Sequence, residues 1–193
     1  MRIGVVSDNH GYFDPRVHEA LSDVEVILHA GDVGSQSVLD ALAEIAPVLA
    51  VRGNVDSVLL NLPPSRQLTL HKVQIEMLHI LPSPQSSLSK WARTKELAKA
   101  EGKRKEAFQR SFADATHVVI FGHSHEPCLV TLGQKLFFNP GSAGRPRFSL
   151  PCCCGLLEIS SDELRATVVT LGRYNGDLPE EVRLPLGVKP CGH

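Results

Sequence analysis

The sequence has little that would build a disulfide framework, a membrane span or a surface of one charge. Its five cysteines are an odd number, three of them are consecutive, and no CxxC pair occurs, which argues against a disulfide framework. A zinc site on the three consecutive cysteines is disfavoured, because consecutive residues of a strand point to opposite faces. The apolar runs are too short to cross a bilayer. A formal net charge of -1 gives no general reason to expect a nucleic-acid or membrane partner. These absences favour a cytoplasmic protein with reduced cysteines, and because the first apolar run begins at Ile3, we expect no targeting segment.

What is present fits one globular domain over residues 1–193, with 42% hydrophobic and 21% charged residues. Strands and helices are predicted to alternate at first: one helix opens at Asp14-Pro15 and a second is capped by Ser35 or Ser37. Beyond residue 118 the predicted strands follow one another directly. This order favours a layered α/β fold with a mixed sheet or two packed sheets. The tail from about Gly172 is rich in Gly and Pro, and we expect it to be irregular.

Five short apolar runs end just before side chains that can bind a metal. These side chains are Asp8 and His10, His29 and Asp32, Asn54 and Asp56, His79, and His123 and His125. In an open α/β sheet, ligands gather beyond the carboxyl ends of the strands, so we expect these side chains to share one edge. Carboxylate, amide oxygen and imidazole suit Mn, Fe, Zn or Ni better than Ca or Mg. Without His29 and Asp56, seven such side chains remain, which are too many for one tetrahedral ion but suffice for two ions that share a bridging carboxylate.

The same residues lie in SDNHG, HAGD, RGNVD and GHSHEP, which are followed by NPGS. Together and in this order, the motifs resemble those of the calcineurin-like metallophosphoesterases, over residues 1 to about 170. The resemblance is strongest to the small bacterial and archaeal phosphodiesterase branch, which also contains the retromer scaffold subunit. It implies a β-sandwich flanked by helices. It also implies a phosphodiesterase in which a hydroxide that bridges two metal ions attacks the phosphate.

The resemblance further implies a ligand set. The first metal would be held by Asp8, His10 and His125, the second by Asn54, His79 and His123, and Asp32 would bridge them. Manganese is the foremost candidate, with Zn, Fe or Ni as alternatives. Asn54 and His123 are candidate contacts to the transition state, and His29 is expected to orient a ligand rather than to bind metal.

The sequence departs from the family pattern at two positions. Many relatives have a histidine after the Gly-Asn pair, which can protonate the leaving group, but Val55 stands there in this chain. His79 usually precedes glycine, whereas Ile80 follows it here. Val55 removes an obvious general acid, and Ile80 weakens the assignment of His79.

Several alternatives remain open in the sequence. The same site suits a phosphomonoesterase or nucleotidase, and the same fold suits a scaffold or binding protein with a vestigial site; a candidate for each of seven ligands favours the enzyme. We expect a small phosphodiester or nucleotide-like substrate, and leave self-association and nucleic-acid binding open. The basic segment Lys90 to Arg110, with eight basic and three acidic residues, either attracts anionic substrates or is a solvated helix. Asp56 and Asn139–Ser142 either contact ligands or shape turns, and Arg145 and Arg147 either bind phosphate or are solvated.

Overall fold

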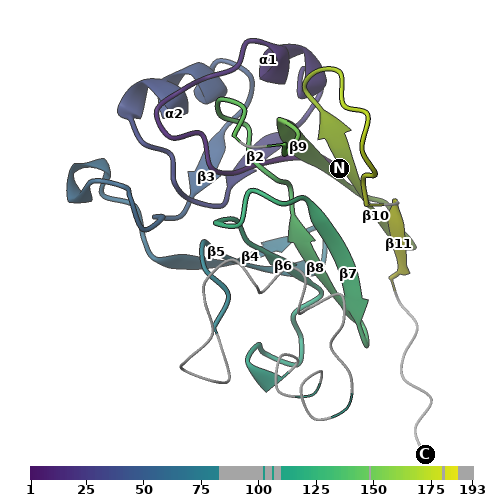
Figure 1. Ribbon diagram of the computed structural model, residues 1–193. Helices are drawn as coiled ribbons and strands as arrows, with labels where there is room; N and C mark the ends of the chain where they lie inside the picture. Colours follow the sequence, from purple (N-terminus) through teal and green to yellow (C-terminus); the bar gives the residue numbers. More distant parts are fainter. Residues whose placement is uncertain (83–101, 103–105, 107–109, 148, 180, 187–193) are drawn as a thin grey trace, which may run out of the picture.

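The computed structural model describes residues 1–82, 102, 106, 110–147, 149–179 and 181–186. Figure 1 shows two β-sheets packed face to face, with two helices on the outer side of one sheet. In chain order the elements are β1 (Arg2–Val6), α1 (Arg16–Ala20), β2 (Val26–His29), α2 (Gln36–Ala43), β3 (Val48–Ala50), the 3-10 helix η1 (Val58–Leu60), β4 (Ser65–Leu70), β5 (Val73–Leu78), β6 (Val118–Ile120), β7 (Cys128–Leu132), β8 (Lys135–Asn139), β9 (Cys153–Ile159), β10 (Glu163–Thr170) and β11 (Val182–Pro185). The expected layered α/β class is confirmed. None of the helices described could span a membrane, because none is both long and apolar enough.

Both sheets are mixed. The first sheet has the strand order β11-β10-β9-β1-β2-β3, in which β1, β2 and β3 are parallel and the other neighbours are antiparallel. The second sheet has the order β4-β5-β6-β8-β7, in which β5, β6 and β8 are parallel. The parallel strands form one side of the first sheet, with β3 at its edge, and the centre of the second. Their carboxyl ends therefore bring the following loops of each sheet to a common edge.

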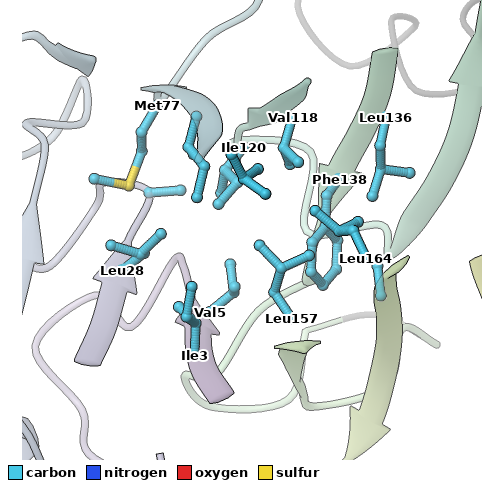
Figure 2. Packing of buried hydrophobic residues seen from close by; sticks show 14 of the residues in the cluster. Ile3, Val5, Leu28, Met77, Val118, Ile120, Leu136, Phe138, Leu157 and Leu164 are labelled. Carbon is cyan, nitrogen blue, oxygen red and sulfur yellow. The ribbon is translucent and has the colours of Figure 1, made fainter. Parts of the chain in front are cut away.

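The alternation of side chains along β1 explains how the layers are held. Ile3 and Val5 are fully buried between the sheets, whereas Val6 is buried against the helices. Figure 2 shows Ile3, Val5 and Leu28 of the first sheet facing Met77 and the neighbouring side chains of the second. On the outer side, Val17 of α1 and Val38 and Leu42 of α2 pack in one cluster with β1 and β2. A strand covered on both faces must be apolar at consecutive positions, as β1 is.

The ends of the helices agree closely with the sequence. Helix α1 begins at Arg16, one residue later than a helix with Asp14 as its N-cap would, and Asp14 Oδ1 accepts the backbone N–H of Arg16 at 3.0 Å. Helix α2 has Ser35 as its N-cap, one of the two residues predicted for that position. The carboxylate of Asp14 thus still satisfies one of the N–H groups that a helix start leaves without a partner.

The tail differs from the prediction. The sequence predicts an irregular segment from about Gly172, but β11 lies within it and pairs antiparallel with β10. Val182 and Leu184 pack against the core between the sheets, while Arg183 points to solvent. Only four residues alternate in this way, so the strand forms because β10 offers an edge to pair with, which local sequence does not reveal. The helices predicted between Ser86 and Ala115, and the basic segment Lys90 to Arg110, lie largely outside the described residues.

Candidate metal centre

The candidate ligands follow the carboxyl ends of five strands from both sheets. Strands β1, β2 and β3 of the first sheet lead to Asp8 and His10, to Asp32 and to Asn54, and β5 and β6 of the second lead to His79 and to His123 and His125. Backbone hydrogen bonds hold these loops together: the N–H of Asp8 donates to Gly31 O at 3.0 Å, and that of Gly122 to His79 O at 3.1 Å. The predicted gathering of ligands at one edge is therefore present in the fold.

Six of the seven candidate ligands form two groups of three. One group is Asp8, His10 and His125, the other is Asp32, His79 and His123, and within each group the ligand atoms lie within 4.8 Å of one another. In the first, His10 Nε2 is 3.1 Å from His125 Nε2, and His125 Nε2 is 3.3 Å from Asp8 Oδ1. In the second, His79 Nε2 is 3.3 Å from Asp32 Oδ2. Each group combines residues from both sheets.

The two groups adjoin through Asp32. Its Oδ2 atom is 3.8 Å from His10 Nε2 of the other group and 3.3 Å from His79 Nε2 of its own. The carboxylate is almost completely buried, and its Oδ1 atom accepts the backbone N–H of Val55 at 3.1 Å. Asp32 thus lies next to a histidine of each group.

Asn54 is placed differently from the other six. It is exposed, and it lines a pocket together with His79, Arg52, Ser65 and Ile80. Asn54 therefore lies at the solvent side of the second group, in one pocket with the histidine whose metal ion it was predicted to share.

Five candidate ligands have a backbone conformation that residues other than glycine rarely adopt. Eight non-glycine residues among those described have positive φ, and five of them, Asp8, His10, Asp32, His123 and His125, are candidate ligands, with φ from 49° to 73°. Each such residue costs of order 1–3 kcal/mol and persists only where the surrounding structure enforces it, and such residues cluster at functional sites. The loops are therefore held in a strained arrangement that directs these side chains inward.

Two glycines leave the room that this arrangement needs. A Cβ atom on Gly53 would overlap the carboxylate of Asp32, and one on Gly122 would overlap Ser7 Oγ and approach Asp8 Oδ2. Only glycine fits at these two positions, because the backbone lies directly against the candidate ligands. The Gly in RGN and the Gly in GHSH thus serve close approach as well as turning of the chain.

The unpaired atoms of the site test whether these residues fit a cation. Asp8 Oδ2 accepts hydrogen bonds from Ser7 Oγ at 2.6 Å and His123 N at 3.0 Å, but the buried Asp8 Oδ1 has no hydrogen-bond partner among the described residues. His79 Nδ1 is 2.7 Å from the carbonyl oxygen of Ala30, which can only accept, so this nitrogen carries the proton. The other nitrogen, Nε2, is buried and also has no hydrogen-bond partner in the described part of the chain. An unpaired carboxylate oxygen and an imidazole oriented by a carbonyl are what a metal site requires.

The electrostatics of the site favour a cation. Burial by itself lowers the pKa of His79, but Asp32 and Asp8 outweigh burial and raise it above its ordinary value. Burial also opposes ionisation of Asp32, yet His79, the Val55 N–H and His10 together lower the pKa of Asp32 to about 2. A carboxylate that stays ionised in a buried site creates a negative potential that attracts positive charge.

His29 and Asp56 have supporting roles. His29 is fully buried and bonds to Asn9 Oδ1 at 3.0 Å and to the N–H of Gly31 at 3.2 Å, so it orients the loops that carry Asp8 and Asp32. The carboxylate of Asp56 accepts the N–H groups of Gly34 and Gly53 at 2.7 and 2.8 Å, which is the role of a turn residue.

The NPGS motif supports the ligand loops in the same way. Asn139 Nδ2 donates to Gly122 O and Ser124 Oγ, and Ser142 Oγ donates to Asp8 O at 2.9 Å. Sequence reasoning did not single out Ser7 or Asn9, which hold Asp8 and His29. Both lie inside SDNHG, and that position was the only signal that pointed to them.

Comparison with known proteins identifies the family. The model of the calcineurin-like phosphoesterase superfamily domain matches residues 1–162. The chain belongs to this superfamily. Two archaeal proteins described as probable metallophosphoesterases, from Methanocaldococcus jannaschii and Methanothermobacter thermautotrophicus, are each 30% identical to it over 89% of this chain and over 82% and 94% of their own.

Solved structures share the fold at lower identity. Vps29 of Entamoeba histolytica, solved in complex with Zn²⁺, has a TM-score of 0.68 and 22% identity, with 96% of this chain and 99% of that chain covered. A structure described as a novel archaeal phosphodiesterase has a TM-score of 0.62 and 21% identity, with 88% and 100% covered. The expected metallophosphoesterase-type fold is thus confirmed, and the family is one of metal-dependent phosphoesterases.

Proposed function

We propose that the protein is a phosphodiesterase that depends on two divalent cations. The observation that carries the proposal is the pair of ligand groups that adjoin through Asp32, with unpaired atoms on Asp8 and His79. Asp8, His10 and His125 would hold one ion, and Asn54, His79 and His123 would hold the other. Two such ions, when bound, supply a clamp for the phosphate and lower the pKa of a water for in-line attack.

The residues of the chain have distinct tasks in this proposal. Asp8 and Asp32 offset the repulsion between two dications, and hydrogen bonds from Ser7 Oγ and the Val55 N–H orient these carboxylates. Ala30 fixes the tautomer of His79. Asn54 and His123 are the candidate contacts to the phosphate as charge develops on it. The Val55 side chain has no proton to donate, so the leaving group must depart with little help from a general acid.

The comparisons support the reaction class and the cation. Two relatives are probable metallophosphoesterases, one solved neighbour is a phosphodiesterase, and another binds Zn²⁺. Manganese is our first choice of metal, with Zn, Fe or Ni as alternatives, because imidazole and carboxylate together suit these borderline ions. The substrate class is a small phosphodiester or a nucleotide-like molecule.

One assay tests this proposal directly. Protein stripped of metal with a chelator is reloaded with Mn²⁺, Ni²⁺ or Zn²⁺, and hydrolysis of bis(p-nitrophenyl) phosphate is compared with that of p-nitrophenyl phosphate. We expect metal-dependent turnover, a higher kcat/KM for the diester, and two equivalents of bound metal. A higher kcat/KM for the monoester would favour the phosphomonoesterase alternative, and full activity without metal would refute the proposal.

A scaffold is the second candidate. The Vps29 neighbour supports it. So do two consecutive apolar side chains of the 3-10 helix η1, Val58 and Leu59, which are 75% and 90% exposed and which a partner would cover. Tight metal binding without turnover of either ester would favour this candidate over the enzyme.

A further inference from the structure

The loop that follows NPGS is fastened to the loop that carries the first ligand group. The N–H of Ala143 donates to Ser7 O at 2.9 Å, and Ser142 Oγ donates to Asp8 O at 2.9 Å. Gly144 lies so close that an added Cβ would be 2.7 Å from the carbonyl oxygens of Asp8 and Asn9. The chain immediately after Gly144 therefore begins next to the loop of Asp8 and His10, and the close contact at Gly144 restricts where this part of the loop can lie.

Two arginines follow this contact. The guanidinium carbon of Arg145 lies 4.5 Å from the centre of the Tyr12 ring, two residues beyond His10. Arg147 follows two positions later on the same loop, and both arginines are exposed. The loop thus presents two charged side chains immediately after its contact with the loop of Asp8.

A stacked guanidinium keeps its binding capacity. Contact with the Tyr12 ring uses the face of the guanidinium, while its N–H donors lie in the plane and can still bind two oxygens of a phosphate. Tyr12 therefore acts as a positioning residue that fixes the direction of Arg145. Two cationic side chains on a loop that docks beside a candidate cation centre repel the ions expected there. This arrangement is favourable only when an anion lies between the arginines and the centre.

We infer that Arg145 and Arg147 form an anion subsite next to the metal centre, and that the substrate is a phosphate ester with a second phosphate. This inference rests on the proposed function, which supplies the ester at the metal centre. A simple diester carries one negative charge, which the two divalent cations already neutralise. The two arginines match a further phosphate on the same molecule, through charge-assisted and bidentate contacts.

Binding of a matched pair of probes tests the subsite without turnover. Thymidine 3′,5′-bisphosphate and thymidine 5′-monophosphate are titrated by calorimetry into the Mn²⁺-loaded protein. We expect the bisphosphate to bind roughly tenfold or more tightly, because charged hydrogen bonds to one phosphate are worth at least that factor. Arg145→Gln and Arg147→Gln should each reduce this preference, and the double variant should abolish it. Equal affinity of the wild type for both probes, a preference that survives in the double variant, or no binding at all would overturn the inference.

Control variants separate the subsite from general charge and from folding. Arg183→Gln removes an exposed arginine on β11, three strands away from β1 in the first sheet, and should keep the preference. Tyr12→Phe keeps a ring beneath Arg145 and should keep it too, whereas Tyr12→Leu should weaken it. Loss of the preference in Arg183→Gln would mean that net charge alone is responsible.

Turnover distinguishes this inference from the proposed function. The p-nitrophenyl ester of thymidine 5′-phosphate is compared with the same ester that carries a 3′-phosphate, and we expect the lower KM for the second. If neither ester is hydrolysed while the bisphosphate still binds more tightly, the proposed function fails and the subsite stands. If both are hydrolysed with the same KM, and the probes bind equally, the subsite fails and the proposed function stands.

Discussion

His10 Nε2 and His125 Nε2 lie 3.1 Å apart although 115 positions separate the two residues in the chain. One follows β1 of the first sheet and the other follows β6 of the second. Both nitrogens also approach Asp8 Oδ1, at 3.9 and 3.3 Å. Two imidazole nitrogens that meet beside a carboxylate oxygen offer three ligand atoms to one cation.

Replacing Asp32 with asparagine should remove at least one equivalent of metal and nearly all turnover. The amide cannot offset the repulsion of two dications that a shared carboxylate offsets. Elemental analysis of the purified variant measures the metal, and thermal unfolding with Mn²⁺ measures the linked stability, about 2.7 kcal/mol at 100 times Kd in the wild type. Asp40→Asn on α2 is the control, because Asp40 is exposed and outside both ligand groups. Two equivalents of metal and undiminished activity in Asp32→Asn would refute the bridging role.

The strained backbone of His10 predicts an unusual order of stability. With metal removed by a chelator, His10→Gly should be more stable than His10→Ala by about 1 kcal/mol, because φ is 49° there and only glycine adopts this value without strain. His18 in α1 provides the opposite case, since His18→Gly should be less stable than His18→Ala by about 1 kcal/mol. Urea unfolding of the four variants measures both differences. If His10→Ala is more stable than His10→Gly, as expected for the corresponding variants of His18, His10 is not strained.

The Val55 side chain predicts a strong dependence on the leaving group. Without a general acid, log kcat/KM for a series of aryl and alkyl diesters should fall steeply as the pKa of the leaving alcohol rises. General acid assistance is typically worth about 10²–10⁴-fold. Val55 is 55% exposed, so Val55→His has room for the ring and should make the slope shallower, mainly by accelerating poor leaving groups. A flat line in the wild type would mean that another group donates the proton.

The buried His29 predicts a loss of stability in acid. Burial lowers the pKa of His29 from 6.5 to about 4. Between these two pH values His29 is protonated in the unfolded chain and neutral in the folded protein. Stability is therefore complete above pH 6.5 and falls as the pH drops toward 4, by about 3 kcal/mol for this group alone. Urea unfolding between pH 7 and pH 4 with chelator present measures the change. His29→Gln can still hydrogen-bond but cannot titrate, and it should lose less stability over the same range; an identical pH dependence would contradict the role of His29.

Much of the site could be predicted because apolar runs mark the ends of the strands and the residue types mark the candidate ligands. Apolar runs followed by Asp8, Asp32 and His79 place these residues at the carboxyl ends of strands, and parallel strands bring such ends together. Strand ends and residue types alone do not show that His79 lies with Asp32 and His123 rather than with Asp8, and only the family resemblance implied this grouping. That grouping depends on how the two sheets face each other.

The remaining features depend on contacts between distant segments. The carbonyl of Ala30 fixes the tautomer of His79 from 49 residues away, and a carbonyl group is present at every residue, so nothing in the sequence marks this one. Strand β11 forms on an edge that β10 supplies. The stacking of Arg145 on Tyr12 requires the loop after NPGS to dock beside SDNHG. Local patterns of residue type do not show which distant segments come into contact.

Because each ligand group takes residues from both sheets, an ion bound in either one would act as a clasp between the two layers of the sandwich. The long chain segments that join the sheets would then be closed into shorter loops, which removes freedom from partly opened forms of the molecule. Amide hydrogens at the carboxyl ends of β1 and β6 should exchange faster after chelation than those of β10, at the far side of the first sheet. The centre proposed for hydrolysis would thus also set how readily the two sheets part.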